Sequence, residues 1–274
     1  PAGSAVRSDG FIPWLFKLNE YGTSDELAAE LDYWRSACGV EDDGAFQDWP
    51  DGALAWRSIG KTTLSAADNG RLLEIYRTPV ARNAVILAAL AATWADATGD
   101  RAPLIMTEGH GRHPFPGTQP MTAVGWFATR YPVGVSVHEG TDAGTLVQDV
   151  ITRLSTVPNL GIGYDLLRRR PAGDPLREDM ERLRRPGIFL QYRGNIDETF
   201  RPDAVMPIVG VYHEGRALNQ SLCSQGDIQP LSVTAGLSDG ILYWSVFFTP
   251  PVSEDRAQEI SDGIRRFLID LASG

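Results

Sequence analysis

Apolar residues recur along this chain with two different periods, and each period predicts a set of elements. Spacing of three and four predicts helices at 11–21, 24–34, 65–75, 83–98, 142–154 and 253–271. Alternation and short apolar runs predict strands at 56–64, 103–107, 130–137, 187–192, 205–213, 231–237 and 241–248. Strands interleaved with helices, without an internal repeat or a linker, indicate one mixed α/β unit with a sheet backed by helices.

Local signals sharpen several of these predictions. Ser24 and Ser65 stand where a hydroxyl can cap a following helix. The segment at 39–52 is acidic and rich in turn residues, which predicts a surface loop. The glycines at 161–165 predict a further turn. The helix at 83–98 lacks a wide polar face, so we expect it to be buried in the core.

The same pattern argues against a membrane or secreted protein. No apolar run approaches the roughly 18 residues that span a bilayer. The richest run, at 84–95, ends at Asp96, and the first residues lack the charged and then apolar pattern of a signal peptide. We therefore expect a cytoplasmic location. Cys38 and Cys223 have no metal-ligand spacing, and two reduced thiols are the simplest interpretation.

Charge excludes another class of partner. The 274 residues carry 35 acidic and 25 basic side chains, a formal net charge of -10. Nucleic-acid binding depends on a basic surface, so we expect no nucleic-acid partner. Arg168, Arg169 and Arg170 begin a basic stretch, but acidic residues are interleaved with it. A self-paired helix face is the default interpretation, and a docking surface for an acidic carrier or partner is the alternative.

Glu108 begins the sequence Glu-Gly-His-Gly-Arg-His, which offers the best candidate chemistry. A glycine-rich turn after a strand can present side chains at a cleft, and Glu108 there could act as a general base. Spacing alone favours a plainer interpretation, an ion pair between Glu108 and Arg112. His110 and His113 lack a third ligand, so we predict no metal site. The chain has no nucleotide-binding loop and no serine nucleophile elbow.

Several motifs, in order along the chain, carry a family resemblance. Residues 108–112 resemble the motif EGHGRE, residues 124–127 with Tyr131-Pro132 resemble VGWFT…YP, and residues 157–164 resemble PxxGxGYG. Tyr192, Gly194 and Asp197 resemble a strand written FNYLGQFD. The chain thus resembles the C-terminal lobe of a condensation-superfamily domain of nonribosomal peptide synthetases, closest to the epimerization type.

The resemblance implies a chloramphenicol-acetyltransferase-like lobe. In that family, a thioester carried on the phosphopantetheine of a peptidyl carrier domain enters a tunnel between two lobes. It implies that Glu108 is the catalytic carboxylate. His110, Arg112, Trp126, Gln191 and Tyr192 would then lie along the tunnel, and no other cofactor is expected. Phe127 and Tyr131 are expected to pack in the core.

The family's HHxxxDG motif belongs to the N-terminal lobe, and this sequence has no adjacent histidines. We therefore expect that lobe to be absent here, this lobe to be inactive alone, and the face toward its partner to be exposed and apolar. That face would favour dimerisation or poor solubility.

Four departures from the family pattern support a rival function. They are His113, Asp165, Gln191 and Arg193. Some members of the superfamily, the X domains, are catalytically silent and recruit a cytochrome P450 to the carrier-bound peptide. The arginine stretch could then serve docking. Epimerization stands slightly ahead because the Glu108 motif is retained, and a condensation catalyst is third.

Overall fold

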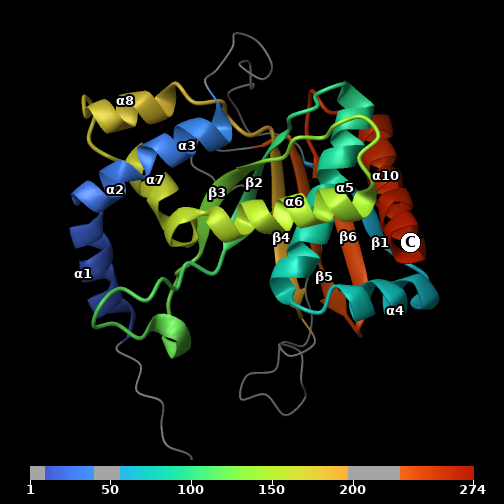
Figure 1. Cartoon of the computed structure of the whole chain (residues 1–274), viewed down its shortest axis with the longest axis horizontal. Coiled ribbons are helices and arrows are strands. Elements are labelled where there is room, and N and C mark those ends of the chain that lie inside the picture. Colours follow the sequence, from blue (N-terminus) through green and yellow to red (C-terminus); the bar gives the residue numbers. More distant parts are fainter. Residues whose placement is uncertain (1–9, 40–55, 197–228) are drawn as a thin grey trace, which may run out of the picture. The chain divides into compact units, whose positions relative to one another are not determined.

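The computed structural model describes residues 10–39, 56–196 and 229–274 (Figure 1). They form two compact units rather than the single unit predicted. Unit 1 comprises Pro1–Asp42, Glu108–Pro132 and Thr156–Arg185, and unit 2 comprises Asp43–Thr107, Val133–Ser155 and Pro186–Gly274. The chain crosses repeatedly between them, so no linker in the sequence marks the division. The predicted loop at 39–52, apart from Gly39, the predicted strand at 205–213 and Cys223 lie outside the described residues.

Unit 1 is mainly helical. Its described helices are α1 (Phe11–Tyr21), α2 (Asp25–Ala29), α3 (Leu31–Cys38), η1 (Pro120–Thr122), η2 (Pro158–Gly161), α7 (Ile162–Arg168) and α8 (Pro175–Glu181). The first helix is confirmed at both ends. The Ser24 hydroxyl caps α2 by accepting from the Leu27 N–H at 3.1 Å, as predicted.

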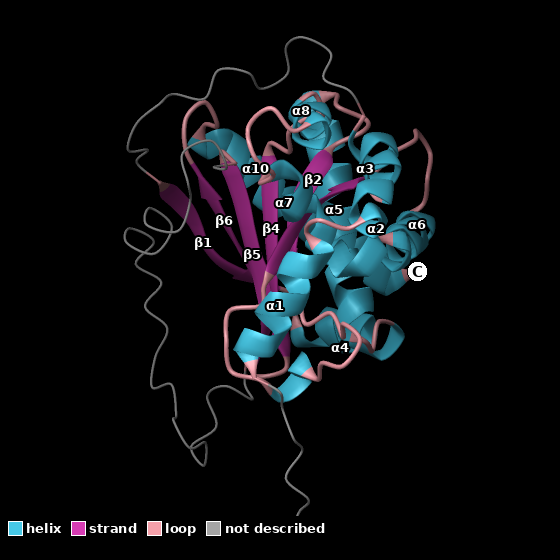
Figure 2. Cartoon of the chain, turned by 90° about the vertical axis from the view of Figure 1, so that its left-hand side faces the viewer, coloured by secondary structure: helices cyan, strands magenta, loops and turns pink. Residues whose placement is uncertain are grey.

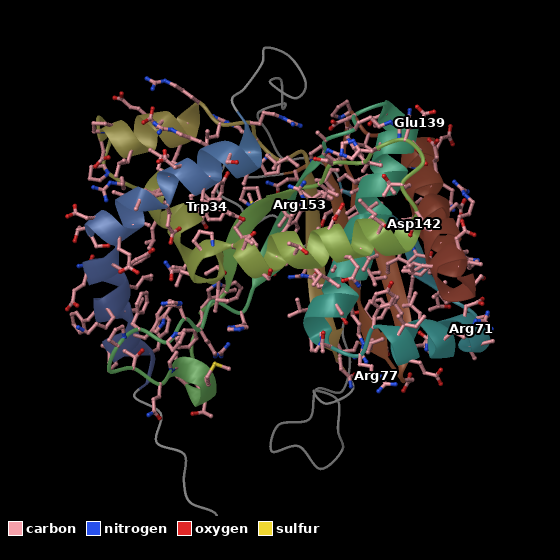
Figure 3. All side chains as sticks on the ribbon, in the orientation of Figure 1. Trp34, Arg71, Arg77, Glu139, Asp142 and Arg153 are labelled. Carbon is pink, nitrogen blue, oxygen red and sulfur yellow. The ribbon has the colours of Figure 1, made fainter. Side chains whose placement is uncertain are left out.

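The predicted helix at 24–34 is two helices that meet at Glu30. Leu27, Leu31 and Trp34 are all buried, as predicted. The indole of Trp34, labelled in Figure 3, meets the ring of Tyr164 on α7 edge-on, with centroids 5.1 Å apart. The residues predicted as a turn at 161–165 are therefore the end of η2 and the start of a buried helix.

A six-stranded sheet runs through the described residues, in the order β1-β6-β5-β4-β2-β3. The strands are β1 (Arg57–Thr63), β2 (Leu104–Gly109), β3 (Thr129–Gly134), β4 (Ile188–Asn195), β5 (Leu231–Ser238) and β6 (Ile241–Phe248). Strand β4 is parallel to β2 and β5, whereas β6 is antiparallel to β1 and β5. The mixed sheet backed by helices is confirmed, and most of it belongs to unit 2.

The turn between β5 and β6 is closed by Asp239 and Gly240, both with positive φ (53° and 68°). That conformation suits a two-residue hairpin between twisted strands. Asn69, on α4 (Ala66–Ile75), donates to the Gly240 carbonyl at 2.9 Å and accepts from the Leu242 N–H at 2.8 Å. One buried amide thus ties the hairpin to a helix.

Helices α4, α5 (Pro79–Thr98), α6 (Ala143–Thr156) and α10 (Glu254–Ser273) lie on one side of the sheet (Figure 2). α5 starts before the predicted residue 83, because Thr78 caps it and Pro79 suits a first turn. Of the described helices, α5 alone is long and apolar enough to cross a membrane. Most of it is buried in unit 2, which is how the core helix of a globular protein behaves.

Candidate functional site

Glu108 and Gly109 are the last residues of β2 and belong to unit 1. The strand continues two residues beyond its predicted end, so the Glu108 side chain leaves from extended backbone and is half-buried. A Cβ atom on Gly109 would lie 3.0 Å from Thr129 Oγ1 and 3.3 Å from the ring of Tyr131. The backbone beside Glu108 is therefore closely packed.

Gly111 makes the sharp turn that follows. Its φ is +59°, and a Cβ atom there would lie 1.7 Å from the carbonyl oxygen of Phe127. Only glycine fits a left-handed position with backbone so near. The second glycine of the motif is thus required by the shape of the turn.

Arg112 braces this turn. Its guanidinium lies over the ring of Phe127, 4.6 Å from the centroid, and donates to the Ala123 carbonyl at 3.3 Å. Its backbone N–H donates to His110 Nδ1 at 3.0 Å. These contacts give the guanidinium a role in holding the loop, different from the ion pair with Glu108 that spacing alone favoured.

The two histidines of the motif differ in exposure. His110 is exposed. His113 packs edge-on against Phe115 at 4.7 Å, and its carbonyl accepts from Trp14 Nε1 at 3.0 Å. Partial burial lowers the pKa of His113, against the raising effect of the Glu26 and Glu30 charges. Within the described ranges no three His, Cys, Asp or Glu side chains gather as a metal would require.

The aromatic residues after this turn divide between core and surface. Phe127 is buried against Phe11 and Trp14, with ring centroids 5.0 and 4.8 Å apart. Tyr131 is also buried, and burial raises its pKa to about 12. Core packing is confirmed for both. Trp126 is 72% exposed, so its side chain lies on the surface of unit 1 and not in its core.

The turn at 158–161 has an unusual backbone. Asn159 and Leu160 both have positive φ (45° and 58°), and Gly161 follows at +79°. A Cβ atom on Gly161 would lie 2.0 Å from the Tyr131 ring. The first glycine of the GxGY motif therefore makes room for an aromatic residue of another motif.

Glu30 is the site residue that sequence reasoning missed. Its carboxylate is buried and accepts from the Tyr21 hydroxyl, from Trp34 Nε1 at 3.1 Å and from Asn159 Nδ2 at 2.7 Å. A Cβ atom on Gly163 would lie 1.9 Å from Glu30 Oε2. Burial, followed by the hydrogen bond to Glu30, raises the pKa of Tyr21. An acidic residue between apolar helical positions was the available signal.

Gln191 and Tyr192 lie on β4, in unit 2. Gln191 Oε1 accepts from Arg193 Nε at 3.1 Å, so two departures from the family pattern contact each other. Tyr192 is half-buried, and burial raises its pKa against the opposing effect of Arg82. The other four predicted site residues, Glu108, His110, Arg112 and Trp126, belong to unit 1.

The arginine stretch is largely paired within unit 1. Arg170 bonds Asp174 at 2.8 Å and the Gly22 carbonyl at 2.7 Å. Arg168 lies over the ring of Tyr164 and donates to its hydroxyl at 3.3 Å, and Arg169 is exposed. The self-paired face, which was the default interpretation, is what these contacts show.

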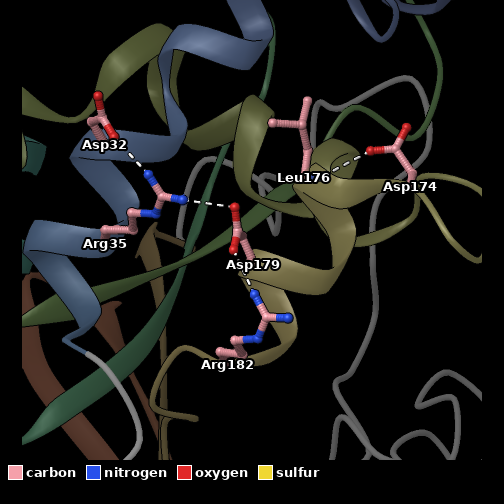
Figure 4. A network of polar contacts seen from close by, with 6 residues as sticks. All are labelled: Asp32, Arg35, Asp174, Leu176, Asp179 and Arg182. Atoms are coloured by element: carbon pink, nitrogen blue, oxygen red, sulfur yellow. Dashed lines mark hydrogen bonds and ion pairs between the residues drawn. The ribbon is translucent and has the colours of Figure 1, made fainter.

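A second network joins this stretch to the N-terminal helices (Figure 4). Arg35 on α3 pairs with Asp32 at 3.0 Å and with Asp179 on α8 at 2.7 Å. Asp179 also pairs with Arg182 at 2.8 Å. The ion pairs thus link helices that lie far apart in the sequence.

Comparison with known proteins places this fold. No family model matches the chain. Over 97% of its length it superimposes on the epimerization domain from the third module of tyrocidine synthetase B, with a TM-score of 0.76 and 23% identity. It also matches the first condensation domain of the CDA synthetase over 94% of its length, with a TM-score of 0.58 and 18% identity. The chain has the condensation-superfamily fold of nonribosomal peptide synthetases.

Curated sequences agree with this class. A linear gramicidin synthase from Brevibacillus parabrevis is 31% identical over 71% of this chain. Bacitracin synthase 2 from Bacillus licheniformis is 25% identical over 98% of it. The chain spans 3% and 10% of these relatives, and 60% of the tyrocidine epimerization domain structure. The resemblance to the condensation superfamily is confirmed.

Proposed function

We propose that the chain is the C-terminal lobe of an epimerization-type domain in a nonribosomal peptide synthetase, with Glu108 as the base that removes the α-proton. The observation that carries this proposal is the backbone around Glu108. A half-buried carboxylate lies at the end of a strand and is followed by a closely packed Gly109 and by a turn that requires glycine at position 111. A general base depends on such a fixed position.

The reaction suits a carboxylate. The substrate is an aminoacyl or peptidyl thioester on the phosphopantetheine of a peptidyl carrier domain. Glu108 takes the proton from the α-carbon, and the electron pair of the broken C–H bond moves to form an enolate on the thioester oxygen. Return of a proton to the opposite face of the α-carbon gives the D configuration, and no oxidant or other reactant is consumed. Hydrogen-bond donors would stabilise the enolate oxygen.

The second acid–base group in this scheme would come from the HHxxxDG histidines of an N-terminal lobe, which lie outside these 274 residues. We therefore expect residues 1–274 to be inactive by themselves. Trp126, His110, Gln191 and Tyr192 remain proposed tunnel residues, whereas Arg112 acts by holding the turn. The site of action would be the cytoplasm, where such synthetases meet their carrier domains.

Two of the four departures are compatible with catalysis. His113 stands where the family motif has an acid, and its ring packs on Phe115. Asp165 lies in the first turn of α7, where an acid is favourable to the helix dipole. Neither change removes a group that the proposed reaction needs.

The test uses the full-length protein that carries this chain, with its carrier loaded with an L-aminoacyl or L-peptidyl thioester. In deuterated water we expect deuterium at the α-carbon and D-configured product. Glu108→Gln should abolish both, because an amide cannot take the proton. The matched control is Glu139→Gln, which changes an exposed carboxylate in a loop of unit 2 (Figure 3) and should leave both unchanged.

The alternative function is a silent, X-type domain that recruits a partner enzyme such as a cytochrome P450. This alternative is favoured by Gln191 and Arg193, which differ from the family pattern and contact each other. They lie on a strand that the family places beside the tunnel. A folded, loaded protein that shows no α-proton exchange would overturn epimerization and move the search to partner binding, with a cytochrome P450 as the first candidate. Amide-bond formation between two loaded carriers would instead indicate a condensation catalyst.

A further inference from the structure

The turn at Asn159, Leu160 and Gly161 places three consecutive residues in the left-handed region. Glycine adopts this region freely, but Leu160 has a side chain that disfavours it, and Asn159 is tolerated there only moderately. Such a backbone persists where its surroundings determine it strongly, and these places are often functional.

The side chain of Asn159 is what anchors this turn. Its Nδ2 group donates to Glu30 Oε1 and to the Tyr21 hydroxyl, both at 2.7 Å. Glu30 is buried and also accepts from Trp34 Nε1, so its position is set by three donors from three different elements. Hydrogen bonds to a buried carboxylate are among the stronger ones in proteins. The turn is therefore fastened to a rigid point.

The other side of the turn lies against the residue next to Glu108. The Leu160 carbonyl accepts from Thr129 Oγ1 at 3.1 Å. A Cβ atom on Gly109 would lie 3.0 Å from that same Oγ1 and 3.4 Å from the Leu160 oxygen. The ring of Tyr131 lies close to both Gly109 and Gly161, so it forms a second contact between the turn and the end of β2. A continuous set of contacts thus runs from Glu30 to the backbone of Gly109, which follows Glu108 directly.

We propose that Glu30 and Asn159 are positioning residues for Glu108: they hold the left-handed turn against Gly109 and so fix where the carboxylate points. This inference rests on the proposed function for its catalytic consequence. Neither residue touches the reacting atoms, and all of the contacts belong to unit 1.

Asn159→Asp is the decisive variant. Aspartate has the same shape and the same tolerance for positive φ, but it cannot donate, and it places a second carboxylate against Glu30. The matched control is Asn69→Asp, which removes the donor to Gly240 from a buried position of unit 2. Both variants lose one amide donor, from a half-buried position at Asn159 and a buried one at Asn69, and only the first lies on the path to Glu108.

Glu30→Gln separates positioning from stability. Its amide oxygen can still accept from Tyr21 and Asn159, but its NH2 group then faces the Trp34 N–H, and two donors in contact destabilise the fold. Because the acceptor for Asn159 is kept, we expect the melting temperature to fall and the rate of α-proton exchange to fall less than it does in Asn159→Asp. In Asn159→Asp the kcat should fall at least about tenfold, at an unchanged KM, which corresponds to about 1.4 kcal/mol of transition-state stabilisation.

The position of the backbone is measured independently of turnover. Amide hydrogen exchange of residues 108–111 should be at least about tenfold faster in Asn159→Asp than in the wild type, and unchanged in Asn69→Asp. If the wild type shows no α-proton exchange, the proposed epimerization fails while this measurement still decides the positioning. Unchanged amide exchange in Asn159→Asp, or a kcat that simply follows melting temperature across the variants, would overturn the positioning role.

Discussion

The carbonyl oxygen of Phe127 occupies the space that a side chain on Gly111 would need, 1.7 Å from an ideal Cβ position. The two residues come from different motifs of the chain. Their close approach requires a glycine at position 111 while the backbone carbonyl of Phe127 keeps its place. A change at either residue should alter the loop that follows Glu108.

Gly111→Ala should therefore destabilise unit 1 severely. The substitution adds a left-handed strain of about 1–2 kcal/mol to a backbone collision that only movement of the loop can relieve. Thermal unfolding measures the loss. Gly117→Ala is the control, because Gly117 has a φ of +79° with nothing within 4 Å and should show the strain alone. Equal losses of stability in Gly111→Ala and Gly117→Ala would contradict a collision between the added Cβ atom and the Phe127 carbonyl.

Gly263→Ala should destabilise the packing of α10 against α5. Alanine favours a helix by about 1 kcal/mol over glycine, but a Cβ atom here would lie 2.2 Å from Thr93 Cγ2. We expect a net loss of about 1–3 kcal/mol from overpacking. Chemical denaturation of both single variants and of Gly263→Ala with Thr93→Ala measures the coupling. The double variant should recover stability, and strict additivity would show that the helices simply move apart.

The unfolding free energy should fall as the pH rises above about 9. Burial raises the pKa of the Cys38 thiol to about 12, against the lowering effect of Arg168 and Arg184. In the unfolded chain that pKa is about 8.5, so the unfolded state releases this proton first and becomes favoured by about 1.4 kcal/mol per pH unit. Denaturation at pH 8 and at pH 10 measures the difference.

Cys38→Ala should reduce the slope of the unfolding free energy against pH by the equivalent of about one proton, or about 1.4 kcal/mol per pH unit. Tyr164 contributes in the same direction only above about pH 10, because burial raises its pKa from 10 to about 12. A free energy of unfolding that is flat from pH 8 to pH 10 in the wild type would contradict the buried thiol.

Arg170→Ala should cost more stability than Arg182→Ala. Arg170 is only 20% exposed and donates to the Gly22 carbonyl, and a hydrogen bond from a charged donor is worth about 1.5–3 kcal/mol. Arg182 is 66% exposed, and its ion pair should contribute less than about 0.5 kcal/mol. Thermal unfolding compares them. A larger effect of either on carrier or partner binding than on stability would favour a docking role for this stretch.

The sequence predicted the elements of this fold better than their assembly. Helix caps such as Ser24 and Ser65 are local, so the ends that they define could be predicted. The turn at Asn159 could not be, because its backbone depends on Glu30, which lies 129 residues earlier. The break at Glu30 was missed for the same reason, since a buried carboxylate is explained only by donors that the fold supplies.

The candidate site shows the same limit. The motif around Glu108 could be found from residue types, and the resemblance supplied a role for it. Spacing alone suggested that Arg112 pairs with Glu108, whereas the guanidinium lies over Phe127. Arg112 and Phe127 are joined by a loop, and the pattern of apolar residues predicts helices and strands but not the path of a loop. The division into two units was also hidden, because composition does not change where the chain passes from one to the other.

The three-part make-up of unit 1 has a consequence for synthesis on the ribosome. Its helices α1, α2 and α3 are translated before the rest of the unit, whereas the turn that binds Glu30 and Asp179 of α8, which pairs with Arg35, follow only after more than a hundred further residues. Contacts of such long sequence separation form slowly and leave early segments unpartnered. Until residue 159 has left the exit tunnel, the carboxylate of Glu30 lacks its donor Asn159. Until residue 185 has left it, unit 1 is incomplete. Helices α1, α2 and α3 therefore remain without these contacts for most of the time in which unit 1 is being made.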